Sequence, residues 1–454
     1  MLMENIIKEI EKIVGKDFVI YEKEKIESYF FDETCIPIRP KPALKCILVK
    51  PENSEQISRI LKLANEKRIP VYPRGGGTGL VGGCIPTRDG IIVSLERMDN
   101  IEIDKDNLMA IAEAGATLGK LLKIAEEAGL SFPPHPGDEG AQIGGLIACN
   151  AGGARAVKHG IMRNFVKGLE VVLPTGEIVK FGGKLLKDNM GYGLMHIIIG
   201  SEGTLGIITK AIIRLCPKAE YMLTLILPFN SRHDALNVVP IILTKGIIPL
   251  ALEYVEKEIM EKSAAHLGEK WTIDGKVFLI AILAGTENEV LSDAEKMARI
   301  CAENKSLEAY IAERRDEQDA ILKIRSNIYT ALKEESCDIL DTTVPPSNIG
   351  KLADEIDRIA EKYNAYIPVY GHAADGNIHS HIMKNDIDKY ERIKSEIYEA
   401  TIKLGGVITG EHGIGKIRTK ELYKFIPSKN IELMKGIKKL FDPNNILNPD
   451  AVLT

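Results

Sequence analysis

The sequence predicts an α+β protein with two lobes, and two observations carry that prediction. The first half of the chain places three glycine-rich loops among short strands, at residues 74–83, 134–153 and 200–206. The second half alternates strands with long amphipathic helices. Runs of strands and runs of helices of this kind are typical of α+β domains. The chain has 454 residues, which is enough for two or more domains with full cores.

Composition excludes several classes of protein. The formal net charge is 59 − 64 = −5, without a basic stripe, so we expect no nucleic-acid partner. The first residues carry Ile6, Ile10 and Ile13 at helical spacing and lack the unbroken apolar core of a signal peptide. No run approaches the roughly 18 apolar residues of a membrane span. We therefore expect a soluble, cytoplasmic protein. The seven scattered cysteines argue against a disulfide framework, a zinc ribbon or an iron–sulfur cluster.

Four segments follow from the order of these patterns. Pro217 comes after the last strand of the glycine-rich half and marks the predicted boundary between two domains. We expect an N-terminal helical segment at 1–43, a first domain at 44–217, a second domain at 218–425, and a C-terminal segment at 426–454 that packs back on the first domain.

The elements of the first half are short and bounded by turn residues. A helix capped by Asn53 or Ser54 and a helix capped by Thr117 both have an N-cap residue directly before an apolar periodic run. Pro174–Thr175–Gly176 separates two strand-like runs and predicts a hairpin. The predicted helices are 55–67 and 117–128, and the predicted strands are 44–49, 71–73, 91–95, 109–114, 166–173, 177–181 and 207–215.

The first glycine loop matches a dinucleotide fingerprint by letters alone. Residues 77–82 read GTGLVG, which fits G-x-G-x-x-G, but a true fingerprint opens a helix. Here Gly83, Cys84 and Ile85 lead to Pro86 and then to a strand. The context therefore predicts a strand–loop–strand nest of backbone N–H groups, which suits a pyrophosphate.

The stretch from Pro134 to Gly153 holds six glycines, and only residues 141–148 could form a short helix or strand. Glycine within a regular element costs about 0.5–1 kcal/mol relative to alanine, so such density needs a reason. One possible reason is a ligand that packs against the main chain, and the alternative is that the stretch is a loop-rich connection between strands.

The second half carries the longer elements and most of the candidate chemistry. Strands are expected at 221–227, 251–255 and 277–283, and helices at 231–244, 286–304, 316–335, 347–363 and 389–404, with Thr286 and Glu289 as a capping box. His379 and His381 lie two apart on an expected strand and share one face, while His372 lies upstream across a turn at Gly376.

A second polar segment, Thr409–Gly413, carries Glu411 and His412 between glycines. Two imidazoles and a carboxylate would suit Zn²⁺, Mn²⁺ or Fe²⁺. The alternative is that each histidine is an ordinary hydrogen-bonded residue. Arg325 lies within an amphipathic helix, where it is either a solvated residue or an anion clamp.

Together these motifs resemble the FAD-linked oxidases, whose flavin domain is of the vanillyl-alcohol oxidase and p-cresol methylhydroxylase type. The likeness is strongest to the branch of D-lactate dehydrogenase, glycolate oxidase flavoprotein subunit and D-2-hydroxyglutarate dehydrogenase. It rests on PRGGGTGL, the GG…NAGG segment, GSEGTLGIIT, GHAADGNIH, TGEHGIG and FDPNNILNP, in that order along the chain.

The resemblance implies FAD bound between two α+β lobes. Relatives with covalent flavin in the first loop have a histidine there, and residues 75–83 contain none, so we expect non-covalent FAD. The residues implied to contact FAD are Arg74, Gly75, Gly76, Gly77, Thr78, Gly79, Leu80, Pro136, Gly137, Asp138, Gln142, Ile143, Gly144, Gly145, Asn150, Gly152, Gly153, Glu202, Gly203, Gly206, Ile207 and Asn448.

The resemblance also implies a metal and a catalytic set. His372, His379 and Glu411 match the ligands of a divalent metal in metal-dependent relatives, His412 matches the base, and Arg325 matches the substrate-carboxylate clamp. Asn377 and His381 complete the candidate catalytic residues. Three positions depart from the pattern usual in the family. Ala374 lies where glycine is usual, Leu322 where tryptophan is often found, and His381 where several relatives have asparagine or proline, so the role of His381 is open.

The implied reaction is oxidation of a D-2-hydroxy acid to the 2-oxo acid, with hydride transfer to flavin N5. Two alternatives stay open: a flavoprotein of another reaction class, similar to alkylglycerone-phosphate synthase, or the flavin subunit of a multi-subunit electron-transfer complex. The resemblance further implies an electron acceptor, which would be an iron–sulfur protein, an electron-transferring flavoprotein or a quinone, and it favours a homodimer.

Overall fold

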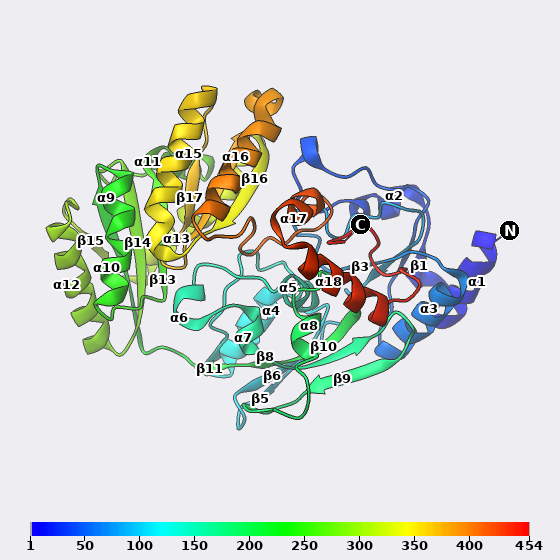
Figure 1. Ribbon diagram of the computed structural model, residues 1–454. Helices are drawn as coiled ribbons and strands as arrows, with labels where there is room; N and C mark the ends of the chain where they lie inside the picture. Colours follow the sequence, from blue (N-terminus) through cyan, green and yellow to red (C-terminus); the bar gives the residue numbers. More distant parts are fainter. Residues whose placement is uncertain (1, 454) are drawn as a thin grey trace.

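The computed structural model describes residues 2–453 and has two lobes side by side (Figure 1). In the first lobe, a small sheet in the order β1-β2-β4-β3 lies beside a five-stranded antiparallel sheet in the order β5-β6-β10-β8-β9. Both sheets share one apolar core with the helices around them. The strands are β1 Val19–Ile20, β2 Ile47–Val49, β3 Val71–Arg74, β4 Ile91–Ser94, β5 Ile101–Asp104, β6 Met109–Glu113, β8 Val166–Val172, β9 Ile178–Gly182 and β10 Ile207–Arg214.

Helix caps in this lobe form as the sequence predicts. The Asn53 side chain accepts a hydrogen bond from the backbone N–H of Gln56 and starts α3, and Thr117 does the same for Lys120 at the start of α4. The predicted hairpin forms, with β8 antiparallel to β9. The helices are α1 Leu2–Val14, α3 Ser54–Lys67, α4 Leu118–Glu127, α5 Ile143–Cys149, α6 Ala156–His159, α7 Met162–Phe165 and α8 Met195–Ile198.

The second lobe is one antiparallel seven-stranded sheet with helices on both faces, in the order β15-β12-β14-β13-β17-β18-β16. One face packs against α9, α10, α12, α15 and α16, and the other against α11, α13 and α14. The strands are β12 Tyr221–Phe229, β13 Ala251–Glu256, β14 Val277–Gly285, β15 Tyr310–Ala312, β16 Ser336–Thr343, β17 Val369–His372 and β18 Asn377–Met383. The helices are α9 Arg232–Asn237, α10 Val239–Thr244, α11 Lys257–His266, α12 Glu287–Glu303, α13 Arg315–Ser326, α14 Ile328–Lys333, α15 Ile349–Tyr363 and α16 Tyr390–Lys403.

Two helices predicted as continuous are broken. The predicted helix 231–244 divides at Val238 into α9 and α10, because Pro240 in the first turn of α10 has no N–H for the preceding turn. The predicted helix 316–335 divides at Asn327 into α13 and α14, where the Asn327 side chain donates to the Ser263 carbonyl at 3.2 Å. Strands β5 and β16 were not predicted.

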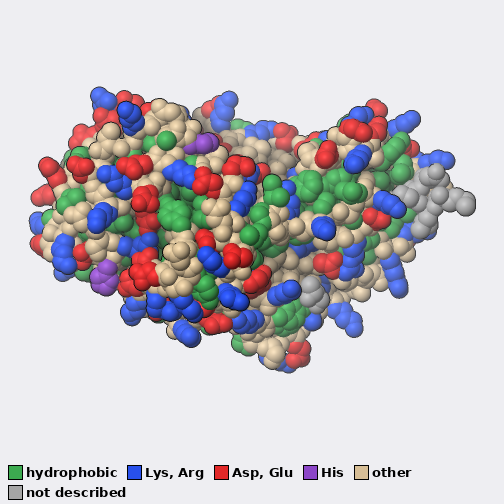
Figure 2. Space-filling model, turned by 90° about the horizontal axis from the view of Figure 1, so that it is seen from above, with side chains coloured by type: hydrophobic (Ala, Val, Ile, Leu, Met, Phe, Trp, Pro, Cys, Tyr) green, Lys and Arg blue, Asp and Glu red, His purple; other side chains and the backbone are tan. Residues whose placement is uncertain are grey.

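The end of the chain returns to the first lobe. Helices α17 Thr419–Phe425 and α18 Ser428–Phe441 cross above α5 (Figure 1), and Leu447 then forms a parallel bridge with Val71 of β3. On the face of the molecule seen in Figure 2, basic and acidic side chains are interspersed, without a basic stripe. Among the described residues, no helix combines the length and apolar character that crossing a membrane requires.

Candidate functional site

The first glycine loop joins two parallel strands, β3 and β4, without an intervening helix in the described structure. This confirms the strand–loop–strand prediction and excludes the Rossmann interpretation of residues 77–82. Among the hydrogen bonds of the described residues, none is donated by the backbone N–H groups of Gly76, Gly77, Thr78 or Gly79. Four consecutive amides without a protein acceptor form a ready site for an anion such as a pyrophosphate.

The central glycine stretch packs directly against this loop. A Cβ on Gly76 would lie 2.8 Å from the Gly140 carbonyl oxygen, so only glycine allows this approach. A Cβ on Gly137 or on Gly145, by contrast, would meet nothing within 4 Å. The side-chain oxygen of Gln142, in the same stretch, is buried and has no hydrogen-bond partner among the described residues. Buried polar atoms without partners are rare, so this cradle fits a bound polar group such as a flavin.

Other residues of the predicted FAD set are committed to the protein itself. The Arg74 guanidinium donates to the carbonyls of Phe31 at 2.8 Å and Ser28 at 3.1 Å, and it packs directly against Gly77 of the first glycine loop. Several members support the loops by packing rather than by facing open space: Ile143 lies in the core, and a Cβ on Gly144, Gly153 or Gly206 would come within 2.8 Å of neighbouring protein atoms.

The third glycine loop ties the two lobes together. The Glu202 carboxylate accepts hydrogen bonds from the backbone N–H groups of Ile414 at 2.8 Å and Gly415 at 2.7 Å. The Asn448 side chain donates to the carbonyls of Gly83 and Glu202, both at 2.9 Å. The remaining predicted members lie in or next to these three loops: Gly75, Leu80, Pro136, Asp138, Asn150, Gly203 and Ile207.

Three imidazoles converge on one carboxylate in the second lobe. The Oε1 atom of Glu411 lies 3.5 Å from Nε2 of His372, 3.4 Å from Nε2 of His379 and 3.9 Å from Nε2 of His412. The rings of His379 and His412 stack at 5.1 Å with an interplanar angle of 11°. The structure thus brings together all four residues that the sequence singled out, from β17, β18 and the loop before α17.

This arrangement fits a divalent cation. Two atoms bound to one tetrahedral Zn²⁺ at about 2.1 Å each lie about 3.4 Å apart, close to the separations of Glu411 from His372 and His379. Burial disfavours charge on His372, but the Glu253 and Glu411 carboxylates outweigh burial and raise the pKa of His372 well above its usual value. The two imidazoles in turn hold the pKa of Glu411 well below its usual range, against burial. At His379, by contrast, burial outweighs the neighbouring carboxylates and lowers the pKa, so positive charge is favoured on His372 and disfavoured on His379.

Asp341 of β16 organises the loop that carries Glu411 and His412. Its Oδ2 atom accepts hydrogen bonds from the backbone N–H groups of Gly410 at 2.9 Å and of Glu411 and His412 at 2.8 Å, and from the Thr409 hydroxyl at 3.0 Å. Asp341, His379, Glu411 and His412 offer potential ligand atoms within 4.8 Å of one another. Because Asp341 Oδ2 already accepts four hydrogen bonds, we assign it to holding the loop and not to the metal.

The three remaining predicted residues lie close to this cluster. Arg325 of α13 forms an ion pair with buried Glu253, and its guanidinium lies 5.0 Å above the Tyr370 ring. His381 is buried two residues beyond His379 on the same face of β18, where its Nε2 atom lies 3.2 Å from the Tyr370 hydroxyl. Burial lowers the pKa of His381 to about 3, so it is neutral.

Asn377 supports the same cluster from the start of β18. Its amide nitrogen donates to Oδ1 of Asp341 at 2.8 Å, while its own Oδ1 atom is buried without a partner. Asp341 and Glu253 are the two site residues that the sequence analysis missed. An acidic residue inside an otherwise apolar strand, as in CDILDTT and ALEYVE, is the signal that could have found them.

The glycine loops and the histidine cluster face each other. A Cβ on Gly152, in the central glycine stretch, would lie 2.8 Å from Oε2 of Glu411. A Cβ on Gly413 would lie 3.0 Å from the Glu202 carboxylate of the third loop. The loops of the first lobe and the imidazoles of the second therefore border one shared site.

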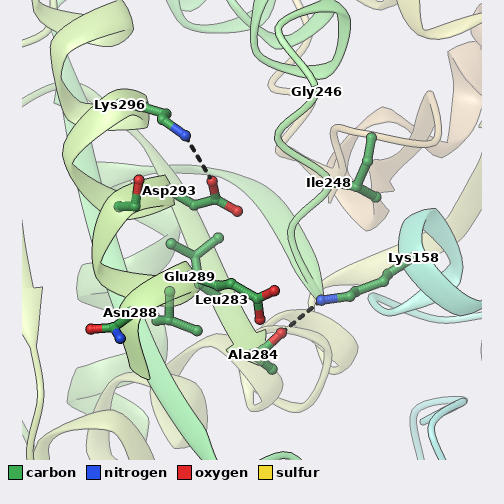
Figure 3. A pocket seen from close by; sticks show the side chains of 11 residues that line it. Lys158, Gly246, Ile248, Leu283, Ala284, Asn288, Glu289, Asp293 and Lys296 are labelled. Carbon is green, nitrogen blue, oxygen red and sulfur yellow. Dashed lines mark hydrogen bonds and ion pairs between the residues drawn. The ribbon is translucent and has the colours of Figure 1, made fainter. Parts of the chain in front are cut away.

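A separate hollow of ≈ 620 Å³ lies between α6 and the start of α12 (Figure 3). Its charged groups already have protein partners: Lys158 donates to the Ala284 carbonyl at 2.7 Å, and Lys296 lies 3.8 Å from Asp293. None of the predicted site residues lines it, and its four ionisable residues, Lys158, Glu289, Asp293 and Lys296, lie on α6 and α12 without a histidine or cysteine among them. We therefore place the candidate site at the glycine loops and the histidine cluster.

Comparison with known proteins assigns the chain to a family. Residues 218–452 match the family described as FAD linked oxidases, C-terminal domain, and residues 46–182 match the one described as FAD binding domain. The first match alone covers more than half of the chain. The protein belongs to the FAD-linked oxidase family and is an FAD-dependent oxidoreductase, as the motifs predicted.

Several relatives match over nearly the whole chain. A D-lactate dehydrogenase of Archaeoglobus fulgidus is 45% identical over 430 residues, covering 94% of this chain and 96% of the relative. The glycolate oxidase subunit GlcD of Bacillus subtilis is 37% identical over 411 residues, covering 88% and 87%. A mitochondrial D-2-hydroxyglutarate dehydrogenase of Arabidopsis thaliana is 32% identical over 460 residues, covering 98% and 80%.

Solved structures confirm the fold class. p-Cresol methylhydroxylase with substrate bound has a TM-score of 0.78 at 19% identity, covering 99% of this chain and 96% of that one. Alkyldihydroxyacetonephosphate synthase has a TM-score of 0.76 at 20% identity, covering 98% and 85%. At these identities the likeness concerns the fold, which is the α+β architecture with a p-cresol methylhydroxylase-type flavin domain.

Proposed function

We propose that this protein is an FAD-dependent, metal-assisted dehydrogenase that oxidises a D-2-hydroxy acid to the 2-oxo acid. The observation that supports it is the convergence of three imidazoles on Glu411, opposite Gly152 of the glycine loops. The names of the relatives indicate the substrate class, which includes D-lactate, glycolate and D-2-hydroxyglutarate.

His372, His379 and Glu411 would hold the metal, and the nest at Gly76–Gly79 would hold the FAD pyrophosphate. Bound FAD would supply the hydride acceptor, at N5, and the divalent ion (Zn²⁺, Mn²⁺ or Fe²⁺) would supply a Lewis acid. With the ion bound, His372 and His379 would each present an unprotonated ring nitrogen and Glu411 would supply the one negative charge, a donor set that suits borderline ions of this kind.

His412 is the proposed general base. Stacking on His379 and the hydrogen bond from its backbone N–H to Asp341 hold His412 beside the proposed metal ligands, where it would take the proton of the substrate hydroxyl. A base positioned in this way typically contributes about 10²–10⁴-fold to the rate. Arg325 is the proposed clamp for the substrate carboxylate, because it is a partly buried cation from a neighbouring helix. His381 and Asn377 contribute by positioning, since both lie behind the cluster.

Anaerobic mixing of the yellow protein with D- and L-2-hydroxy acids tests the proposal. We expect a D-acid to bleach the flavin band, a chelator to prevent bleaching, and His412→Asn to slow reduction by about 10²–10⁴-fold. His233→Asn, on the exposed surface of α9, is the matched control and should leave reduction unchanged. A colourless protein that cannot be reconstituted with FAD would refute the proposal. Retained flavin that no hydroxy acid bleaches would instead favour another flavin reaction, such as alkyl transfer.

The partner assignments belong to the same proposal. The reduced flavin would pass electrons to an iron–sulfur protein, an electron-transferring flavoprotein or a quinone. The rate of flavin reoxidation by each class of acceptor distinguishes them. A homodimer is the proposed oligomeric state, which sedimentation of the holoprotein would test.

A further inference from the structure

Glu253 lies at the centre of the second lobe and contacts two of the proposed site residues at once. It belongs to β13, next to β17 in the seven-stranded sheet, and only 3% of its side chain is exposed. Strand register places it directly opposite His372. Its Oε1 atom lies 2.7 Å from Nδ1 of His372, and its Oε2 atom forms an ion pair with Nη2 of Arg325.

The first contact fixes how His372 presents its ring. A carboxylate only accepts hydrogen bonds, so Nδ1 of His372 carries the proton that Oε1 of Glu253 receives. Nε2 is then the atom directed at Glu411, 3.5 Å away, and it is the nitrogen available to a cation. A carboxylate behind a metal-binding histidine fixes the orientation of the ring and raises its basicity as a ligand.

The second contact fixes the Arg325 guanidinium. Glu253 holds one end of it, and the Tyr370 ring lies 5.0 Å beneath it. Tyr370 is itself held by its hydroxyl contact with His381 at 3.2 Å. The Nε atom of Arg325 is buried and has no hydrogen-bond partner, so a donor remains for an incoming acceptor.

We propose that Glu253 is a positioning residue that orients the metal-binding histidine and the carboxylate clamp together, through the two oxygens of one buried side chain. This inference rests on the proposed function. In a 2-hydroxy acid the hydroxyl and the carboxylate sit on adjacent carbons, so the metal and the clamp must lie at one set separation. A single carboxylate that contacts both residues holds that separation constant.

The test measures the two contacts separately in the FAD-loaded protein. Binding of Mn²⁺, followed by electron paramagnetic resonance, reports on His372, and binding of pyruvate, followed by the change in the flavin spectrum, reports on Arg325. We expect Glu253→Gln to weaken Mn²⁺ binding by about 10–100-fold, as changes behind metal ligands typically do. It should also weaken pyruvate binding at saturating Mn²⁺. Arg325→Lys should weaken pyruvate binding and leave Mn²⁺ binding unchanged.

Glu256→Gln is the matched control, because Glu256 lies on the same strand and pairs with Arg232, away from the cluster. It should retain both affinities. Glu253→Ala is the second variant, in case glutamine still accepts the His372 proton. If either affinity stays at the wild-type value in both Glu253 variants, while flavin content shows that they are folded, the shared role is refuted. A wild-type protein that binds no Mn²⁺ would instead refute the proposed function itself.

Discussion

Replacing Asp341 by asparagine should disorganise the loop that carries Glu411 and His412. The Oδ2 atom of Asp341 accepts four hydrogen bonds from residues 409–412, three of them from backbone amides. Asparagine can present its oxygen to the same donors, but its NH₂ group would then take the place of Oδ1. In the wild-type protein the NH₂ group of Asn377 donates to Oδ1 of Asp341 at 2.8 Å, so the two NH₂ groups would face each other. A flip of Asn377 would remove that conflict and lose its hydrogen bond to the Thr342 carbonyl.

The magnitude follows from the hydrogen bonds. Bonds to a charged acceptor contribute about 1.5–3 kcal/mol and neutral ones about 0.5–1.5, so four bonds weaken by about 4 kcal/mol in total. Burying a neutral amide has a smaller desolvation penalty than burying a carboxylate, and this difference offsets part of the loss. We therefore expect the free energy of unfolding to fall by about 2 kcal/mol. In a domain of this size that lowers Tm by about 4–8 °C. A displacement of the loop by about 1 Å would slow flavin reduction by about 10²-fold.

The assay combines thermal unfolding with anaerobic flavin reduction, and Asp338→Asn is its control. Asp338 lies on the same strand and pairs with buried Arg418 at 2.5 Å, with no contact to the loop. That variant should lose stability but reduce its flavin at the wild-type rate per folded molecule. An Asp341→Asn protein with wild-type Tm and wild-type reduction rate would refute the assignment of Asp341 to the loop.

Three further predictions follow from the site. Gly152→Ala would place a methyl group 2.8 Å from Oε2 of Glu411, so turnover should fall at least about tenfold, whereas Gly83→Ala, with nothing within 4 Å of its Cβ, should be neutral. Dialysis against a chelator should abolish bleaching by the hydroxy acid while flavin content stays constant, and added Mn²⁺ or Zn²⁺ should restore it; unaffected bleaching would contradict the metal assignment. Burial lowers the pKa of Lys416 to about 8 in the folded protein, so between pH 8 and 10 the unfolded chain binds more protons and Lys416 makes stability rise with pH. In flavin-free protein, Lys416→Met should remove that contribution, and denaturant titrations at pH 8 and pH 10 would measure it.

Much of the architecture was predictable because local signals agree with the fold. Caps at Asn53 and Thr117, the turn at residues 174–176 and the glycine loops each depend on neighbours a few residues away. The continuous helices at 231–244 and 316–335 were wrong for the opposite reason. The break at Asn327 depends on its side chain reaching Ser263, more than sixty residues earlier, and no periodicity reports that contact.

The residues of the site likewise fall into those with a local sequence signal and those whose role depends on distant contacts. Histidines and glycines were found because their residue types and spacing are unusual. Asp341 and Glu253 were missed because an acidic residue in a strand is disfavoured unless distant groups compensate its burial. Those groups are the amides of residues 410–412 for Asp341, and His372 and Arg325 for Glu253. Arg74 was placed in the FAD set by the resemblance alone, and its hydrogen bonds to the carbonyls of Ser28, Tyr29 and Phe31 are long-range contacts that the sequence does not signal.

The tail has a consequence for biosynthesis. The Asn448 side chain donates hydrogen bonds to the carbonyls of Gly83 and Glu202 and accepts one from the Lys416 ammonium. Its backbone N–H donates to the Val71 carbonyl. These contacts are made by a residue that is translated hundreds of residues after the loops it braces. Cofactor loading is therefore expected to follow synthesis of residue 448, and a nascent chain that stalls before it would expose an unbraced, glycine-rich surface to chaperones and proteases.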